Sequence, residues 1–149
     1  MPIINSDIRI HPLDLNANVA IGVVFPLMNE GTFGQSFTTK EQVKTNILNV
    51  LLTEKGERIN LPNFGVGLKQ VLLENAVDEI ELKSRISNQL SFYVPEITVE
   101  NLIAEQNEHT LKIILTYRIL ISQKQDTIQV NINNGPSDGI DLNTSATGF

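Results

Sequence analysis

Acidic side chains are the residues of this sequence that are best suited to catalysis. A glycoside hydrolase needs two carboxyl groups, one kept protonated by an apolar pocket and the other ionised. Glu57 does not fit the protonated role, because the adjacent Arg58 places a positive charge where that role needs an apolar wall. Asp78, Glu79 and Glu81 fall at the start of an expected helix, where acidic groups interact favourably with the helix dipole. We therefore expect no enzymatic activity, with paired carboxylates as the alternative.

Nucleophile, metal and nucleotide chemistry also lack their usual patterns. The sequence has no cysteine, which excludes disulfides and thiolate ligands, and it has no Gly-x-Ser-x-Gly motif. His11 and His109 fall in an expected arm and an expected turn, and they do not have zinc-binding spacing. The GVGLKQ stretch begins like a dinucleotide-binding loop, but Gln70 occupies the third glycine position. We expect no metal and no cofactor.

Length and charge limit the class of protein and its partners. A chain of 149 residues has the size of one domain. Its net charge of -6, with scattered basic residues, argues against binding to nucleic acid. No apolar run approaches the ~20 residues that cross a bilayer, and the amino terminus lacks a signal-peptide pattern. We expect no membrane partner, and folding in the cytoplasm.

The GERINLPNFG stretch, residues 56–65, predicts a shaped bend rather than a catalytic loop. Gly56 stands where the preceding helix is expected to end in a left-handed conformation. Pro62 fixes an extended turn, and Phe64 is expected to anchor the bend in the core. Two glycines allow close backbone approach: Gly65 and Gly67. The bend leaves an acid and a base to bond backbone groups or a partner: Glu57 and Arg58.

Apolar spacing predicts the elements that position this bend, beginning with a small N-terminal hairpin. Residues 20–27 and 32–37 are strand-like and flank an MNEG turn. Thr38 followed by Glu41 has the spacing of a capping box, which predicts a helix over 39–54. A second amphipathic helix, ending before a proline, is marked by one apolar set: Val77, Ile80, Leu82, Ile86, Leu90 and Tyr93.

After residue 96 the apolar period changes to two, which predicts three antiparallel strands. The first covers 97–106, and the other two each carry one apolar face: Leu111, Ile113, Leu115, Tyr117, Ile119 and Ile121, then Ile128, Val130 and Ile132. The fold class is therefore α+β, with two main helices and a small N-terminal hairpin packed on a three-stranded antiparallel meander. We expect an extended arm over 1–17, the folded domain over 18–133 and a flexible polar tail over 134–149.

Four segments of the sequence together resemble one known family. In order they are GVVFPL, a helix ending in LLTEKGER, the stretch LPNFGVGLKQVLLEN, and YVPEITVENL after a second helix. This order is similar to that of the small baseplate wedge protein of contractile-tailed phages. The same family supplies sheath-initiator subunits of type VI secretion and extracellular contractile injection systems, and it is sometimes labelled lysozyme-like. The resemblance covers residues 20–132, and the stretch from 56 to 65 is its most specific part.

Two positions depart from the family pattern. The family has an acidic residue before the aromatic residue of its Pro-x-Phe/Tyr-Gly motif, where this chain has Asn63. At the end of the second helix, a Glu-Pro-Arg triplet of the family docks on the central helical bundle of the wedge, whereas residues 94–96 here are Val-Pro-Glu. The resemblance implies either a matching change on the partner or a larger role for Glu57 and Arg58.

The resemblance implies a structural, non-enzymatic subunit of a virion tail baseplate, assembled in the host cytoplasm. The implied partners are baseplate wedge core proteins and tail sheath subunits, with hub or tube-initiator proteins as further candidates and six-fold copies in the particle. The implied wedge-core surface combines the bend with the end of the second helix: Glu57, Arg58, Pro62, Asn63, Phe64, Gly65, Tyr93, Pro95 and Glu96.

The last strands suggest the second binding region. An antiparallel meander leaves an edge strand with unpaired backbone groups, and similar proteins add strands of the first sheath subunits to this sheet. The implied sheath-binding strands contain Leu111, Ile113, Leu115, Tyr117, Ile119, Ile121, Ile128, Val130 and Ile132. Three alternatives stay open: the strands are covered by the chain's own helices, the chain is a peptidoglycan-hydrolysing lysozyme-like tail enzyme, or it is an adaptor of a complex unrelated to tails.

Overall fold

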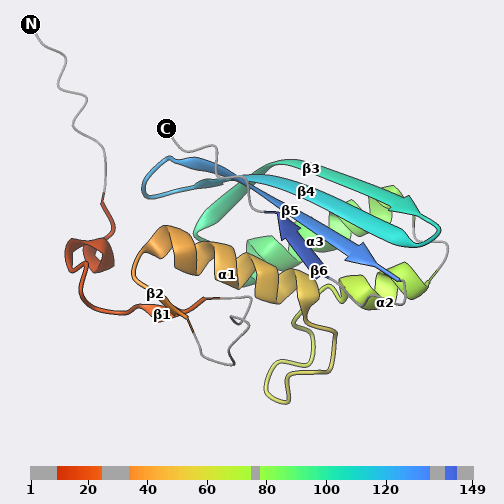
Figure 1. The fold of residues 1–149 in the computed structure, drawn as a ribbon, viewed down its shortest axis with the longest axis horizontal. Helices are drawn as coiled ribbons and strands as arrows, with labels where there is room; N and C mark the ends of the chain where they lie inside the picture. Colours follow the sequence, from red (N-terminus) through yellow and green to blue (C-terminus); the bar gives the residue numbers. More distant parts are fainter. Residues whose placement is uncertain (1–9, 25–33, 75–77, 135–139, 144–149) are drawn as a thin grey trace, which may run out of the picture.

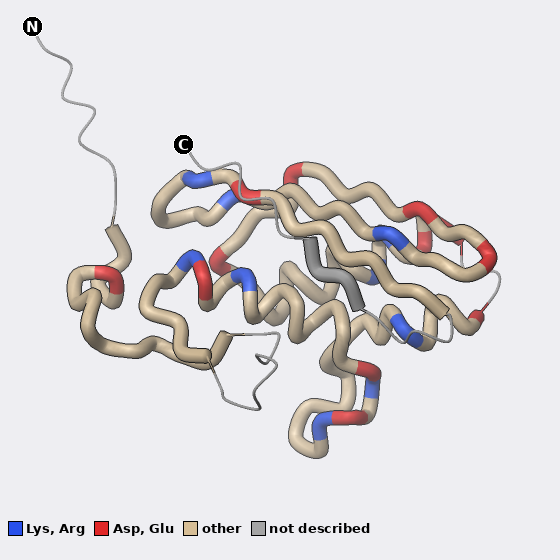
Figure 2. Tube along the Cα trace, viewed as in Figure 1, with Lys and Arg blue, Asp and Glu red and all other residues tan. Residues whose placement is uncertain are grey.

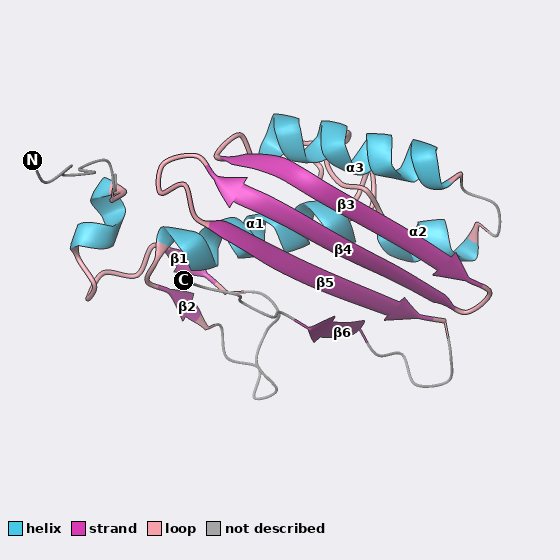
Figure 3. Cartoon of the chain, turned by 90° about the horizontal axis from the view of Figure 1, so that it is seen from above, coloured by secondary structure: helices cyan, strands magenta, loops and turns pink. Residues whose placement is uncertain are grey.

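The computed structural model describes residues 10–24, 34–74, 78–134 and 140–143. Within these ranges, three α-helices cover one face of a four-stranded antiparallel sheet, and a two-stranded ribbon lies beside the first helix (Figure 1). In the view from above, the strands lie between the viewer and the helical layer (Figure 3). The face of the sheet that points away from this layer is therefore not covered by any of the described helices. The α+β class predicted from the sequence is confirmed.

Helix α1 (Thr39–Leu52) begins where the sequence predicts. Thr38 caps it by accepting a hydrogen bond from the Glu41 amide at 3.2 Å. The Glu41 carboxylate in turn accepts one from the Phe37 amide at 3.1 Å, which completes the capping arrangement one residue before the cap. The face turned to the core contains Val43, Thr45, Ile47, Leu48, Val50 and Leu51. Capping and apolar spacing together therefore fix this helix.

The prediction that Gly56 ends α1 is wrong. The C-cap is Thr53 in an extended conformation, and Gly56, with φ of 87°, lies in the following loop. The last turn of a helix leaves carbonyl groups without partners. Here returning amides supply them: Val66 donates to Val50 at 2.9 Å and Gly67 to Thr53 at 2.9 Å. Because these bonds satisfy the end of α1, the helix needs no left-handed glycine cap.

Helices α2 (Leu68–Leu73) and α3 (Glu79–Tyr93) complete the helical layer. Asp78 caps α3 by accepting a hydrogen bond from the Ile80 amide at 3.2 Å. The predicted buried face is confirmed for three side chains at successive turns: Leu82, Ile86 and Leu90. Ile80 is 76% exposed, because residues two apart on a helix point in different directions and Leu82 faces the core. Val77 lies outside the described residues.

The sheet has the strand order β3 (Ile97–Asn107), β4 (Thr110–Ile119), β5 (Gln125–Asn133) and β6 (Ile140–Asn143), with every neighbouring pair antiparallel. The predicted alternation holds in β4 and β5, whose buried residues are Leu111, Ile113, Leu115, Tyr117, Ile119, Ile128, Val130 and Ile132. These side chains and the helices form one continuous apolar core. The meander therefore supplies the sheet side of the core, as the period of two predicts.

Ile121 departs from the predicted strand. β4 ends at Ile119, and Ile121 is an exposed residue of the turn that leads to β5. The turn is closed by a hydrogen bond from the Gln123 amide to the Ile119 carbonyl at 2.8 Å, and Gln123 has φ of 56°. Apolar alternation continues through this turn in the sequence, so the pattern alone places the end of the strand too late.

β6 lies in the segment that the sequence predicts to be a flexible polar tail. It pairs with β5 from Ile132↔Ile140 to Gln129↔Asn143. Hydrogen bonds between strands join main-chain groups, so a short strand can form on an exposed edge without a long apolar pattern of its own. The predicted meander is thereby extended to four strands by the chain's own residues.

The N-terminal segment is tied to the start of α1. The expected extended arm contains a short 3-10 helix, η1 (Pro12–Leu15), because a proline at its start fixes a helical φ. The Asp14 carboxylate accepts hydrogen bonds from the Thr39 amide at 2.7 Å and hydroxyl at 2.6 Å. The predicted hairpin is present as a short ribbon, β1 (Gly22–Val23) with β2 (Gln35–Ser36), and its turn lies outside the described residues.

Candidate functional site

The bend, residues 53–67, projects from the helical layer on the side away from the sheet (Figure 1). Acidic and basic residues alternate along it (Figure 2). Main-chain hydrogen bonds close it on itself, among them those from Gly56 to Pro62 at 3.0 Å, from Leu61 to Arg58 at 3.2 Å and from Phe64 to Leu61 at 3.0 Å. A loop with its backbone groups paired in this way presents its side chains in a defined arrangement.

Gln89 of α3 holds the end of the bend. Its Oε1 accepts a hydrogen bond from the Gly65 amide at 3.0 Å, and its Nε2 donates one to the Asn63 carbonyl at 3.0 Å. Gly65 has φ of 106°, and a Cβ at this position would collide with the Thr53 carbonyl oxygen. The predicted close approach at Gly65 is therefore confirmed. Sequence reasoning missed Gln89, because one glutamine on a helix carries no pattern that indicates its distant partners.

A series of ring contacts joins the bend to the end of α3. The Arg58 guanidinium lies 4.0 Å from the centre of the Phe64 ring, a cation–π contact. Phe64 meets Tyr93 edge-on at 4.7 Å between ring centres, and Tyr93 meets Phe92 in the same way at 4.8 Å. Phe64 is buried, so its predicted role as the anchor of the bend is confirmed. These contacts bring together Arg58, Phe64 and Tyr93, which the resemblance assigns to one surface, and they add Phe92.

Exposed apolar side chains stand at both ends of this series. Ile59 is 96% exposed at the outer part of the bend, and Leu61 beside it is also exposed. Phe92 is 76% exposed on the last turn of α3. We call Ile59, Leu61 and Phe92 the exposed apolar set. Sequence reasoning did not single them out, although an isoleucine between Arg58 and Asn60 in a polar loop is a signal that was available.

Other residues of the predicted wedge-core surface lie in the bend and in the turn that follows α3. The Glu57 carboxylate accepts a hydrogen bond from the Glu54 amide at 3.1 Å, so it bonds the backbone of the bend. Pro95 and Glu96 form the exposed turn between α3 and β3. The Glu96 carbonyl accepts a hydrogen bond from the Leu120 amide at 2.9 Å, which joins this turn to the one between β4 and β5. The Glu96 carboxylate makes none of the hydrogen bonds or ion pairs of the described residues.

Most of the side chains named for sheath binding are buried in the core of this chain. Those on β4 and β5 lie beneath the helices, and Ile121 lies in a turn. One of the alternatives that the sequence left open, coverage by the chain's own helices, therefore holds for this face of the sheet. What these strands can offer to another chain is their main-chain edge. Among the described strands, the sheet ends at β3 on one side and at β6 on the other.

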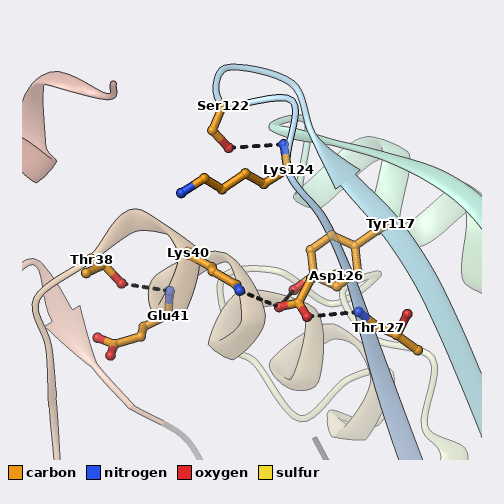
Figure 4. Close-up of polar contacts among 8 residues, drawn as sticks. All are labelled: Thr38, Lys40, Glu41, Tyr117, Ser122, Lys124, Asp126 and Thr127. Carbon is orange, nitrogen blue, oxygen red and sulfur yellow. Dashed lines mark hydrogen bonds and ion pairs between the residues drawn. The ribbon is translucent and has the colours of Figure 1, made fainter. Parts of the chain in front are cut away.

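Asp126 is a buried acidic residue at the start of β5, 2% exposed. It accepts hydrogen bonds from the Tyr117 hydroxyl at 3.3 Å and the Thr127 amide at 3.0 Å, and the Lys40 Nζ lies 3.7 Å from it (Figure 4). Burial first, and then the charge and hydrogen bond of Asp126, raise the pKa of Tyr117. Burial lowers the pKa of Lys44, and the charge of Asp126 opposes that shift. The cluster connects α1 to the sheet.

Acidic residues also gather beside the turn between β3 and β4. A hollow of about 950 Å³ beside the turn between β3 and β4 is lined by Glu79, Glu105 and Glu108, all of which are exposed. Glu105 lies 3.9 Å from Lys112. None of the three is buried in an apolar pocket, which is the setting of a general acid. The described residues also contain no group of three or more potential metal ligands, and among them no helix has the length and apolarity needed to cross a membrane.

Comparisons with known proteins identify the family. The family model "Baseplate wedge protein gp25" matches residues 38–124, more than half of the 149 residues. The chain belongs to the baseplate wedge protein gp25 family. The resemblance inferred from the sequence is thus confirmed, and membership assigns a structural role in the phage tail baseplate and interaction with other baseplate proteins. The match includes the bend, Gln89 and the ring contacts, and it ends before β5.

A solved structure agrees with this baseplate wedge fold. The crystal structure of a Geobacter sulfurreducens protein described as a candidate tail lysozyme superposes with a TM-score of 0.55 at 20% sequence identity. The similarity covers 67% of this chain and 95% of that one. At this level of identity the likeness concerns the fold alone. A comparison with curated protein sequences found no match.

Proposed function

We propose that this baseplate wedge protein fastens to the wedge core through the bend and the end of α3, and that its sheet is extended by strands of tail sheath subunits. Membership of the gp25 family carries the proposal. The arrangement of the bend supports the first contact, because a closed loop presents exposed apolar side chains that the fold itself does not use. An antiparallel sheet with accessible edges supports the second.

The chemistry of the wedge-core contact follows from the exposed residues. The exposed apolar set suits a groove between helices of the partner, where burial of one large aliphatic side chain contributes about 2 kcal/mol. Arg58 is held over Phe64, so it presents its charge in a fixed place. Glu96 stands where similar proteins have arginine, so the partner is expected to offer a basic residue there. Six-fold copies of this contact, one for each wedge, would hold the subunit in the particle.

The docking contact is tested by Ile59→Ser. The side chain is almost fully exposed, so we expect the free energy of unfolding to stay within about 0.5 kcal/mol of that of the parent protein. Binding to purified wedge core proteins should weaken by roughly 30-fold, which corresponds to about 2 kcal/mol. Ile80→Ser is the matched control, since this isoleucine is also exposed but lies on the first turn of α3. Equal wedge binding by both variants would exclude Ile59 from the contact.

A peptidoglycan hydrolase is the second candidate. The observation in its favour is the similar fold of a protein described as a candidate tail lysozyme. The exposed carboxylates of the hollow beside the β3–β4 turn argue against it. Purified protein is expected to leave peptidoglycan intact in a turbidity assay. Clearing that disappears on Glu79→Gln or Glu105→Gln would establish the enzyme instead.

A further inference from the structure

The two sides of the sheet differ in how they would receive another strand. Along β3, the outer strand on one side, the register shifts between Val99 and Asn101. Two acidic residues of β3 make ion pairs with β4: Glu100 with Arg118 at 2.6 Å and Glu105 with Lys112 at 3.9 Å. A bulge and charged side chains are features by which proteins discourage pairing at an edge. β3 is therefore a protected edge.

β5 has the opposite character. It pairs with β4 without a register shift, from Arg118↔Gln125 to Thr110↔Asn133. Its buried side chains are aliphatic after Asp126, and its half-buried face is uncharged, with Thr127, Gln129 and Asn131. A straight strand with a regular register and no outward charge is a good template for a further strand. Of the two long strands at the sides of the meander, β5 is the one suited to strand addition.

β6 covers β5 only in part. Its four residues pair with Gln129–Ile132, and none of the strands described pairs with the outer side of Gln125–Ile128. On that uncovered half, the Thr127 amide donates to the carboxylate of the preceding residue, Asp126, at 3.0 Å. An arm that spans all of β5 could form more main-chain hydrogen bonds with it than the four residues of β6 do. β6 is therefore expected to bind this edge more weakly than such an arm.

We propose that β6 is a placeholder strand, which occupies the β5 edge in the free subunit and is displaced when a sheath arm adds to β5. This inference rests on the proposed function and adds its regulation. The incoming segment would be extended, about nine residues long to match β5, and apolar at alternate positions that meet the buried side of the sheet beside Val130 and Ile132. While β6 is in place, the subunit does not expose the half of β5 that it covers.

A disulfide lock tests the displacement in the full-length chain. The sequence has no cysteine, so a pair introduced as Asn131→Cys with Asp141→Cys would be its only thiols. These residues are register partners on β5 and β6, and antiparallel partners have Cα atoms about 4.5–5.5 Å apart, which a disulfide can bridge. Binding of the purified sheath subunit should fall at least 10-fold in the oxidised form and recover on reduction.

Two further variants keep the test specific. Ile103→Cys with Ile114→Cys joins register partners on β3 and β4, away from β5, and leaves β6 free. Its oxidised form should bind sheath like the parent protein. Asp141→Pro weakens β6 alone, because Asp141 is the register partner of Asn131, whose amide points to β6 as the amide of Thr127 points away from β4, so proline there removes a donor from the ladder; it should raise the association rate several-fold.

The outcomes separate the two proposals. Equal binding of sheath by the oxidised and reduced lock would overturn the placeholder role and leave strand addition at another edge. If neither the parent protein, the reduced lock nor Asp141→Pro binds the sheath subunit, the proposed function itself fails. Loss of binding in the oxidised lock alone, with the β3–β4 control unaffected, supports displacement of β6.

Discussion

At the scale of single residues, Tyr117 and Asp126 decide how the sheet meets α1. The phenol is fully buried and donates to the carboxylate at 3.3 Å, and Lys40 approaches the same carboxylate from the helix. Burial and the charge of Asp126 both favour the neutral phenol, which is why the pKa of Tyr117 is raised. Because of this contact, the free energy of unfolding depends on pH in the alkaline range.

The alkaline loss of stability should depend on Tyr117. Above pH ~10 the unfolded chain releases the phenol proton, whereas the folded chain retains it. The free energy of unfolding therefore falls as the pH rises. This group contributes at most about 1.4 kcal/mol per pH unit to that fall. Tyr117→Phe should cost about 1 kcal/mol at pH 8 and show a smaller further loss at pH 11. Urea unfolding at both values measures this, with Tyr93→Phe as the control.

An equal alkaline loss in Tyr117→Phe and in the parent protein would contradict that assignment. Lys44 has a lowered pKa, and its effect has the opposite sign because the folded chain releases its proton first. Lys44 is present in both proteins, so it cancels in the comparison. The difference between the two pH profiles therefore reports Tyr117.

At the scale of elements, the bend depends on its attachment to α3. Gln89 alone bonds both the Gly65 amide and the Asn63 carbonyl, and the returning chain satisfies the end of α1. The sequence predicts the bend from its glycines and proline, the first long helix from its capping box and apolar spacing, and the second from its apolar spacing and the proline that follows it. It does not predict which helix holds the bend, because that contact joins residues with no shared pattern.

Replacing Gln89 should loosen the bend without unfolding α3. In Gln89→Leu the buried Gly65 amide loses its acceptor, so we expect a loss of about 1–3 kcal/mol in the free energy of unfolding. Asn88→Ala changes the neighbouring exposed residue and should cost less than about 0.5 kcal/mol. Urea unfolding measures both. Equal stabilities of the two variants would show that the hydrogen bonds of Gln89 are not required.

At the scale of the whole molecule, the two proposed contacts belong to different layers. The bend projects from the helices away from the sheet, whereas strand addition would use the outer side of β5 (Figure 1). The helices lie between these regions, so a change in one surface need not disturb the other. Ile59→Ser should accordingly bind sheath subunits as the parent protein does, in the same assay that tests the disulfide lock.

The sequence by itself determined the elements and the family. Helix caps, apolar spacing and the change of period after residue 96 act locally, so they fix α1, α3 and the three long strands, and the motif order identifies a baseplate wedge protein. Only the tertiary structure decided that Gln89 holds the bend, that Phe92 joins the ring contacts, and that β6 occupies β5. The reason is physical, because these contacts join distant residues through single side chains or through backbone groups, which leave no periodic trace in a sequence.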